Sequence, residues 1–416
     1  MKIIRDKKIW GWVFYDWANS VFATVVIAGF FPVVFKQYWA SDLSSEQSTF
    51  WLGSANSFAS LLVVLLAPLL GSLADCAGVR KRLLLLFMFI GVVATMMFYT
   101  IAAGSWWLIL IAYVFGILGF MSANIFYDAM LVDVSRQHHM DKISGLGFGF
   151  GYLGGGILLA LCVFMTEQPA VFGFREAIDV VLFSFVLTAI WWFVFSLPLA
   201  FWVDESPPVT MQKVSVRRVF SETLRTFRHV FRDKQIRLFL LAYWIYIDGV
   251  DTIIRMAVDY GLALGFDSGD LIVALLITQF VGFPAAIVYT HIGNRIGTRK
   301  ALFIGLVIYA FITLWGYQMV SVTEFYALAI MIGLVQGGVQ ALSRSFYARM
   351  IPAERAAEYF GIYNMMGKSA AILGPILMGL IAVLTENHRY SILSIMFLFV
   401  LGMLLLLKVK EPVRAE

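Results

Sequence analysis

The stretch Leu83–Tyr127, LLLLFMFIGVVATMMFYTIAAGSWWLILIAYVFGILGFMSANIFY, contains no Lys, Arg, Asp or Glu. A helix needs about 20 apolar residues to cross the hydrocarbon core of a bilayer. At about 1.5 Å of rise per residue, the stretch is long enough for roughly two crossings. Gly104 lies near its middle, where the chain must turn. The stretch therefore predicts two consecutive transmembrane helices.

The composition extends this prediction to the whole chain of 416 residues. Apolar residues make up 61% and charged residues 14% of it, whereas soluble domains are about half apolar and a quarter charged. A soluble protein of this size has too little interior to hide so much apolar surface. The composition excludes a disordered protein, a nucleic-acid-binding domain and, with only two cysteines, a disulfide scaffold.

Twelve membrane spans are expected, which makes the chain an all-α membrane protein of twelve transmembrane helices. The first six are Trp12–Gln37, Phe50–Leu73, Leu83–Ala103, Trp106–Leu131, Ile143–Thr166 and Val180–Val203. The second six are Leu238–Leu264, Leu271–Thr290, Ala301–Val320, Phe325–Ala348, Phe360–Leu384 and Tyr390–Leu407. The expected organisation is a six-helix bundle at 1–203, a cytoplasmic linker at 204–237 and a second six-helix bundle at 238–416.

The basic residues predict the orientation of these spans. If the N-terminus is cytoplasmic, 25 of the 31 Lys and Arg residues lie on the cytoplasmic side, three lie opposite and three lie inside spans. Cytoplasmic loops of membrane proteins carry an excess of positive charge. Both termini are therefore expected in the cytoplasm. The protein itself is expected in the plasma membrane, which in bacteria is the inner membrane.

The linker contains an expected amphipathic helix. Apolar residues recur at helical spacing from Val216 to Phe231, and arginines fill positions between them. Such a helix suits the surface of an anionic leaflet. A calmodulin-type target or a simple tether between the bundles are the alternatives.

Polar side chains inside the spans are the functional candidates, because a charge at the centre of a membrane is costly. The densest polar faces fall in the first, fourth, seventh and tenth spans, one per unit of three helices, so that they can line one cavity. The expected substrate-binding residues are Asn19, Asn124, Tyr127, Asp248, Asp251, Arg255, Gln336, Gln340, Arg344, Asn364 and Lys368. Asp16, Asp128 and Asp248 are the proton-carrier candidates, because Asp251 is placed to pair with Arg255 one turn away.

Structural explanations of these residues stay open. Asp16 could be solvated near the cytoplasmic end or could cap an interface, and Asp133 is expected to be solvated. Neutral polar groups often serve only as interhelical hydrogen bonds, worth about 0.6 kcal/mol each. In the fifth span, Gly147, Gly151 and Gly155 form a small face that lets another helix approach closely. A nucleotide-binding loop is rejected there, because no strand precedes these glycines.

The loops after the second and eighth spans form an internal repeat, in which Gly78 aligns with Gly297 and Asp75 with Asn294. Matching loops in two six-helix halves predict parallel repeats. The first copy, Gly71-x-x-x-Asp75-x-x-Gly78-x-Arg80-Lys81, resembles the cytoplasmic signature of the major facilitator superfamily, with Cys76 in place of the usual arginine. The residues that correspond to the superfamily's conformational latch are Gly71, Asp75, Gly78, Arg80, Lys81, Asn294 and Arg299. Thr290 and Asn294 replace the Gly and Asp of the second copy, so a weaker latch is expected there.

A narrower resemblance is to the autophagy-linked vacuolar amino-acid effluxers of fungi and their bacterial relatives. It is carried by Tyr15–Ser20, Tyr246–Gly249, Gln340–Ser345 and the segment from Gly361 to Gly374-Pro375. The resemblance implies a transporter that works by alternating access on small metabolites, amino acids in particular.

The resulting hypothesis is a monomeric, non-enzymatic secondary transporter of an amino acid or related zwitterion, coupled to protons. It needs no cofactor, metal or nucleic acid, and its partners are the small-molecule substrate and the lipid bilayer. Two alternatives stay open: a lipid or glycolipid flippase of the same fold, and a polytopic membrane enzyme that acts on lipid. The enzyme is disfavoured because the five histidines lie in loops or at span ends without metal-like spacing.

Overall fold

The computed structural model describes residues 6–135, 139–205, 215–370, 373–385 and 388–412. In these residues the regular secondary structure is helical throughout. Ten of the described helical segments are long and apolar enough to cross a membrane. The protein is therefore an integral, multi-pass membrane protein.

The helices follow the predicted order. The first half contains α1 (Lys7–Val21), which continues through η2 (Phe22–Phe30), α2 (Phe31–Val34) and η3 (Phe35–Trp39), then α3 (Ser45–Ala77), α4 (Arg80–Met97), η4 (Phe98–Thr100), α5 (Trp106–Val134), α6 (Met140–Glu167), η6 (Pro169–Phe172) and α7 (Ala177–Trp202). The second half contains α9 (Lys234–Ala263), α10 (Ser268–Ile296), α11 (Thr298–Gln318), α12 (Val322–Ala348), η7 (Ala353–Arg355), α13 (Ala356–Ala370), α14 (Leu373–Thr385) and α15 (His388–Leu406). Between them lies α8 (Val216–Arg232), the helix expected in the linker.

Each predicted span coincides with a described helix, or a helix pair, to within a few residues at either end. Two predicted spans are not among the ten apolar segments. The seventh, α9, carries Asp248 and Asp251 along its middle. The eleventh is described as two helices, α13 and α14, each too short to cross alone. Residues 371–372, which separate them along the chain, lie outside the described residues, and the predicted bend at Gly374-Pro375 stays a prediction.

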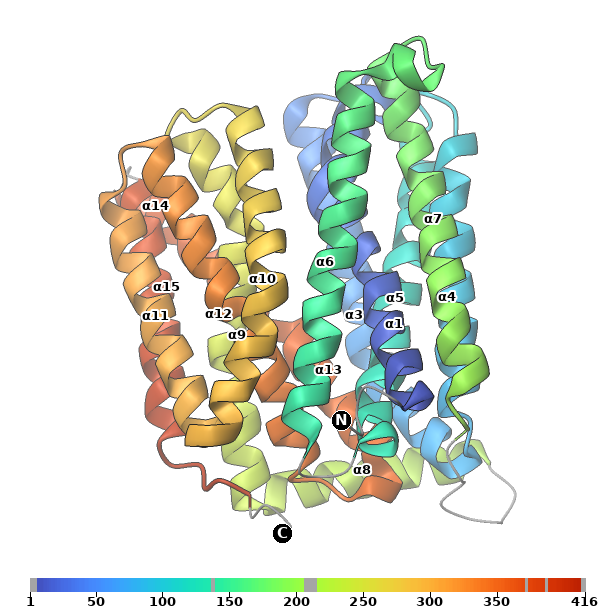
Figure 1. The fold of residues 1–416 in the computed structure, drawn as a ribbon, viewed down its shortest axis with the longest axis vertical. Coiled ribbons are helices and arrows are strands. Elements are labelled where there is room, and N and C mark those ends of the chain that lie inside the picture. Colours follow the sequence, from blue (N-terminus) through green and yellow to red (C-terminus); the bar gives the residue numbers. More distant parts are fainter. Residues whose placement is uncertain (1–5, 136–138, 206–214, 371–372, 386–387, 413–416) are drawn as a thin grey trace.

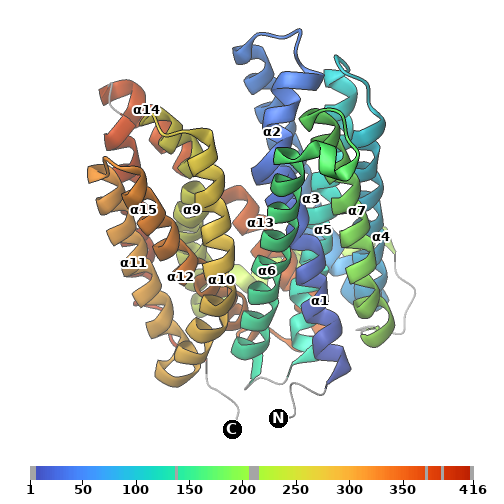
Figure 2. The same cartoon turned by 45° about the horizontal axis from the view of Figure 1, so that its top comes forward.

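The two groups of helices stand side by side with their long axes roughly parallel (Figures 1 and 2). Both chain termini lie at one end of the molecule, here called the terminal end, and α8 runs across it (Figure 1). The opposite end is called the far end. This arrangement of two helical halves places their facing helices α3, α6, α10 and α13 at the seam.

The predicted repeat appears in the backbone. Gly78 ends α3 with φ of +64°, and its counterpart Gly297 ends α10 with φ of +101°. A side chain is strained at such angles, and glycine is not. The aligned glycines therefore both end their helix at a positive φ, although their ψ angles of 44° and 136° give different turns.

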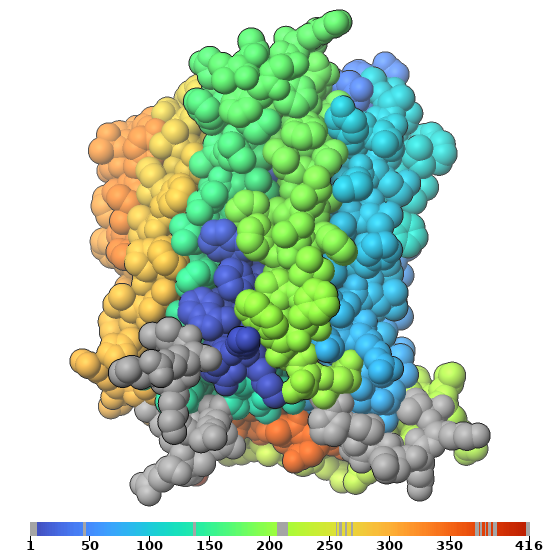
Figure 3. All heavy atoms as spheres, turned by 45° about the vertical axis from the view of Figure 1, so that its right-hand side comes forward, coloured from blue at the N-terminus to red at the C-terminus, as the bar shows by residue number. Residues whose placement is uncertain are grey.

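The halves meet through close helix contacts. A Cβ atom added at Gly71 on α3 would lie 2.1 Å from the carbonyl oxygen of Ala357 on α13. One added at Gly145 on α6 would lie 2.1 Å from Oγ1 of Thr290 on α10. Figure 3 shows α10, in yellow, against the green-to-teal surface of α6. In the internal repeat, Thr290 on α10 occupies the position that corresponds to Gly71 on α3. The small residue at this contact is therefore Gly145 on α6 instead, and the close approach of the two helices is kept.

Candidate functional site

A cluster of buried charged side chains joins the two halves. Arg344 on α12 donates from Nη1 to Oδ1 of Asp128 on α5 at 3.1 Å, and the same nitrogen is 3.8 Å from Oδ2 of Asp16 on α1. Its Nε and Nη2 donate to the hydroxyl and carbonyl oxygens of Ser144 on α6, both at 3.0 Å. One arginine of the second half therefore holds three helices of the first. Asp16, Tyr127, Asp128, Ser144, Arg344 and Asn364 are called the central cluster below.

Each acid of the central cluster has further partners. Tyr127 donates its hydroxyl to Oδ2 of Asp16 at 2.9 Å, and Asn364 on α13 donates to Oδ2 of Asp128 at 3.0 Å. Asp16 is only 8% exposed, so the alternative that it is solvated is wrong. Both acids, predicted as proton carriers, face Arg344. This contact with the arginine was not predicted from the sequence.

Aromatic rings enclose the guanidinium. Its Cζ lies 4.8 Å from the ring centroid of Trp12, 5.2 Å from that of Tyr127 and 4.4 Å from that of Phe148. The Trp12 and Tyr127 rings stack at 4.4 Å, and the Trp12 indole donates to the Tyr127 carbonyl. Ring faces attract a cation, and more strongly where water is excluded.

The glycine face of α6 positions the central cluster. A Cβ atom at Gly147 would lie 2.7 Å from the Tyr127 hydroxyl and 3.0 Å from Oδ2 of Asp16. One at Gly151 would lie 2.5 Å from the Ser20 hydroxyl. The predicted close approach of another helix is confirmed, and that helix is α1 with its polar stripe.

Other predicted binding residues meet in pairs. Asn19 donates to Oδ1 of Asn124 at 2.6 Å, within the first half. Tyr152 on α6 donates to Oε1 of Gln340 on α12 at 3.2 Å, across the seam. Gln336 lies one turn from Gln340 and is buried. These side chains extend the polar seam from the central cluster toward the far end.

The acids of α9 are separate from this cluster. Asp248 is buried and accepts the backbone N–H of Gly374 at 3.0 Å, so it joins α9 to α14. Asp251 and Lys368 are half-buried on α9 and α13. The side chain of Arg255 lies outside the described residues, and its pair with Asp251 stays a prediction.

At the terminal end, Asp75 makes the contacts expected of it. Its carboxylate accepts the backbone N–H groups of Ala357 at 3.3 Å and Glu358 at 2.9 Å, at the start of α13. It also accepts Nε of Arg80 at 2.7 Å. A residue of the first half therefore caps a helix of the second, and its role as a latch stays a prediction.

Arg80 crosses the seam as well. It donates from Nη2 to the carbonyl oxygens of Ala353 at 3.1 Å and Glu354 at 2.9 Å. From Nη1 it donates to both carboxylate oxygens of Asp133 at 3.0 Å. Asp133 itself is exposed, in keeping with its expected solvation. Lys81 instead stays in its own half and donates to the carbonyl oxygen of Val203 at 2.8 Å.

The second copy of the loop uses different residues. Arg299 donates to the carbonyl oxygen of Val409 at 2.7 Å in its own half, and Asn294 is half-buried. The contact across the seam comes from Arg349, which donates to Oδ1 of Asp141 at 2.6 Å. Thr298 donates to Oδ2 of the same acid at 3.1 Å. The seam therefore has charged contacts on this side too, in place of those lost at Thr290 and Asn294.

Sequence reasoning missed Ser144, Asp141 and Arg349. A signal existed for one of them. Asp141 begins the fifth helix of the first half, as Glu358 begins the fifth helix of the second, so the repeat could have paired them. Ser144 carries no charge, and Arg349 counts only as a loop cation, so neither stands out in the sequence.

A partly open pocket lies in the second half. Its lining is almost entirely apolar, from α9, α10, α11, α12, α14 and α15, and includes no residue of the central cluster. A polar substrate needs convergent polar groups, so we place the candidate site at the central cluster. In the described part of the chain, no group of His, Cys, Asp and Glu residues is arranged to hold a metal.

Comparison with known proteins agrees with this architecture. Residues 42–413 match the family described as "Vacuole effluxer Atg22 like". The chain is 37% identical to the MFS-type transporter YxiO of Bacillus subtilis, over 97% of this chain and 95% of that protein. It is 22% identical to autophagy-related protein 22 of Kluyveromyces lactis, over 94% and 91% of the two chains.

Solved structures share the fold. The human organic anion transporter MFSD10 superposes with a TM-score of 0.73 at 15% identity, over 96% of this chain and 98% of that one. The transporter FucP in its outward conformation superposes with a TM-score of 0.70 at 13% identity, over 99% and 100%. The observed helices thus form the major facilitator fold.

Proposed function

This chain belongs to the vacuole effluxer Atg22-like family within the major facilitator superfamily of secondary transporters, and we therefore propose that it carries an amino acid or a related zwitterion. In this proposal the halves rock about the central cluster, which faces one side of the membrane and then the other. The amino-acid class is supported by the family resemblance and by the paired charges of the central cluster.

The ion pair of Arg344 with Asp128 and Asp16 across the seam is the observation that carries the proposal. Buried ion pairs contribute little net stability, because desolvation offsets their attraction, and breaking one leaves a costly unpaired charge. An ion pair between two halves that must separate therefore suits a reversible contact better than a permanent one. The halves can part only when something replaces the partners of Arg344.

A zwitterion can supply that replacement. Its carboxylate fits the planar fork of Arg344, which favours bidentate contact with carboxylates. Its ammonium group matches Asp128 or Asp16. Asn19, Gln340 and the other amides nearby offer hydrogen bonds that fix its orientation. Substrate binding would thus exchange one ion pair for two and release the contact between the halves.

A proton is the proposed coupling ion. Protonation of Asp128 removes the charge that faces Arg344 at 3.1 Å and weakens the same contact. We place proton transfer at Asp128 and Asp16 ahead of Asp248, because these two acids face Arg344 across the seam.

We also propose that the terminal end is cytoplasmic, from the positive charge of its loops. The contacts of Asp75, Arg80 and Arg349 close that end, so the conformation would face outward. The likeness to FucP, which was solved in an outward conformation, supports this assignment.

The test is uptake into proteoliposomes from a panel of amino acids and related zwitterions, with and without a pH gradient. We expect at least one substrate, driven by the gradient. Asp128→Asn should abolish the response to the gradient, and Arg344→Lys should lower uptake because it loses the fork. Asp267→Asn is the matched control, because Asp267 is an exposed cap of α10 and Asn caps equally well.

Absence of flux for the whole panel, with movement of labelled lipid instead, would overturn the amino-acid proposal in favour of a flippase. Full gradient-driven uptake by both Asp128→Asn and Arg344→Lys would show that the central cluster is not the coupling site.

A further inference from the structure

Helix α8 presents three distinct faces at the terminal end. One face carries Thr223, Thr226 and Val230, which are buried against the rest of the protein. A second carries apolar side chains that stay exposed, among them Val216 at 89%, Phe220 at 56% and Phe231 at 60%. A third carries arginines. The helix thus has one partner within the protein and two faces that it leaves uncovered.

The buried face is bonded to the closed seam. Thr226 donates its hydroxyl to Glu358 at the start of α13, and Ser72 on α3 donates to the carbonyl oxygen of Val219 at 3.2 Å. Ser72 also lies 3.3 Å from Oε1 of Glu358. Arg355 donates to Glu222 of α8. The helix therefore bridges the same two helices, α3 and α13, that Asp75 joins.

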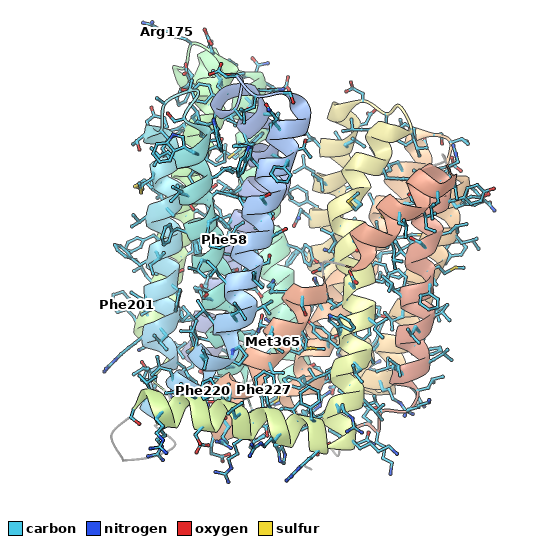
Figure 4. All side chains as sticks on the ribbon, turned by 180° about the vertical axis from the view of Figure 1, so that it is seen from behind. Phe58, Arg175, Phe201, Phe220, Phe227 and Met365 are labelled. Carbon is cyan, nitrogen blue, oxygen red and sulfur yellow. The ribbon has the colours of Figure 1, made fainter. Side chains whose placement is uncertain are left out.

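The uncovered faces match a lipid surface. Figure 4 places Phe220 and Phe227 along the edge of α8 directed toward the transmembrane helices, while nitrogen-ended side chains project from the opposite edge. Val216, Phe220, Leu224, Phe227 and Phe231 follow helical spacing, and the arginines are Arg217, Arg218, Arg225, Arg228 and Arg232. Exposed aromatic rings insert at the boundary of acyl chains and headgroups, and clustered arginines attract anionic headgroups.

We propose that α8 binds the surface of an anionic phospholipid leaflet and, through Glu358, Ser72 and Arg355, strengthens closure of the terminal end. Lipid that holds α8 in its docked position favours the conformation in which α3 and α13 meet. The leaflet's charge would thereby regulate the conformational equilibrium. This inference concerns closure alone and does not rest on the identity of the substrate.

The chain contains a natural reporter of that closure. Cys76 is 4% exposed and lies beside Ser72, close enough to Glu358, Glu222 and Arg218 to interact electrostatically with them. Cys162 is fully buried between other helices of the first half. Undocking of α8 or opening of the terminal end would expose Cys76, whereas only unfolding would expose Cys162.

The experiment measures the rate of maleimide modification of Cys76 in full-length protein in lipid nanodiscs. Discs of phosphatidylcholine are compared with an equal mixture of phosphatidylcholine and phosphatidylglycerol. We expect slower modification in the anionic discs by about fivefold or more, the usual lower range of coupling between sites. High salt should reduce the difference, because it screens charges at a surface.

The charge dependence is tested with Arg217→Gln, Arg228→Gln and Arg232→Gln combined, three exposed arginines of α8. In this variant, Cys76 should be modified at the same rate in the two kinds of disc. The matched control combines Arg82→Gln, Arg295→Gln and Lys300→Gln, which removes three exposed charges from the ends of α4, α10 and α11 and should keep the slower modification in anionic discs. A spin label at Phe220→Cys should report lipid contact, and one at Arg228→Cys should report water.

Equal modification rates of wild-type Cys76 in the two lipids, with Cys162 protected, would overturn the proposal. Loss of the effect in the control variant would overturn it as well, because the response would then be one of general charge. A water-exposed label at position 220 would exclude a lipid-bound α8 and leave an acidic protein partner as the occupant of the arginine face.

Discussion

Replacement of Gly71 by alanine should open the terminal end. Gly71 lies on α3 where that helix crosses the start of α13. An added Cβ atom would lie 2.1 Å from the carbonyl oxygen of Ala357, 2.7 Å from its carbonyl carbon and 3.0 Å from Cα of Glu358. All three are backbone atoms, so no side-chain rotation can relieve the overlap. The alanine fits only if α3 and α13 separate.

The size of the effect follows from that geometry. Overpacking a close contact costs roughly 1–3 kcal/mol, and here the cost falls on the closed conformation only. Alanine also favours the helix over glycine by about 1 kcal/mol, but this gain is common to both conformations and cancels. The closed-to-open ratio should therefore fall by roughly 5–150-fold.

The rate of Cys76 modification by a maleimide measures this shift, because the terminal contacts cover that cysteine. Gly71→Ala should raise the rate of Cys76 modification by a factor that approaches the fall in the closed-to-open ratio. Gly53→Ala is the matched control on the same helix, because a Cβ atom there meets nothing within 4 Å. If both variants react like the wild type while Cys162 stays protected, the contact of α3 with α13 does not hold the end closed, and the reasoning fails.

Two further outcomes are expected. Asp248→Ala should destabilise the protein by about 1 kcal/mol in thermal unfolding, the ordinary contribution of one hydrogen bond. Asp248→Asn should stay near the wild type, because its amide oxygen can still accept the N–H of Gly374; equal losses in both variants would refute this role of the bond. Asp141→Asn and Arg349→Gln should each speed Cys76 modification, and the double variant should add little to either one, because both remove the same contact; additive effects would show that the two residues act separately.

Most residues of the central cluster could be predicted from the sequence as functional candidates, but their contacts with one another could not. Asp16, Asp128 and Arg344 stood out because charged side chains inside apolar spans are rare and costly. Their mutual contacts were not predicted, because they lie far apart in the chain and on helices of different halves. Asp16 and Asp128, predicted as proton carriers, and Arg344, predicted to bind substrate, lie together in one network.

The latch shows the same limit. The signature around Asp75 was visible because it is a local motif, and its bonds to α13 followed once the helices were placed. The contact of Asp141 with Arg349 has no motif, and it was found only where α6 and α12 meet. The pair of Asp133 with Arg80 could not be predicted for a related reason, since the two residues lie on different helices.

The sequence by itself determined the order and approximate bounds of the helices and their apolar length, and it predicted the repeat of the two halves. These depend on the local run of apolar residues, on turn glycines such as Gly78 and Gly297, and on the distribution of basic loops, all of which can be read along the chain. Only the tertiary structure decided which face of each helix turns inward and which side chain meets Arg344. A helix in lipid has several faces that are apolar enough to be covered, and its rotation is set by contacts with neighbouring helices.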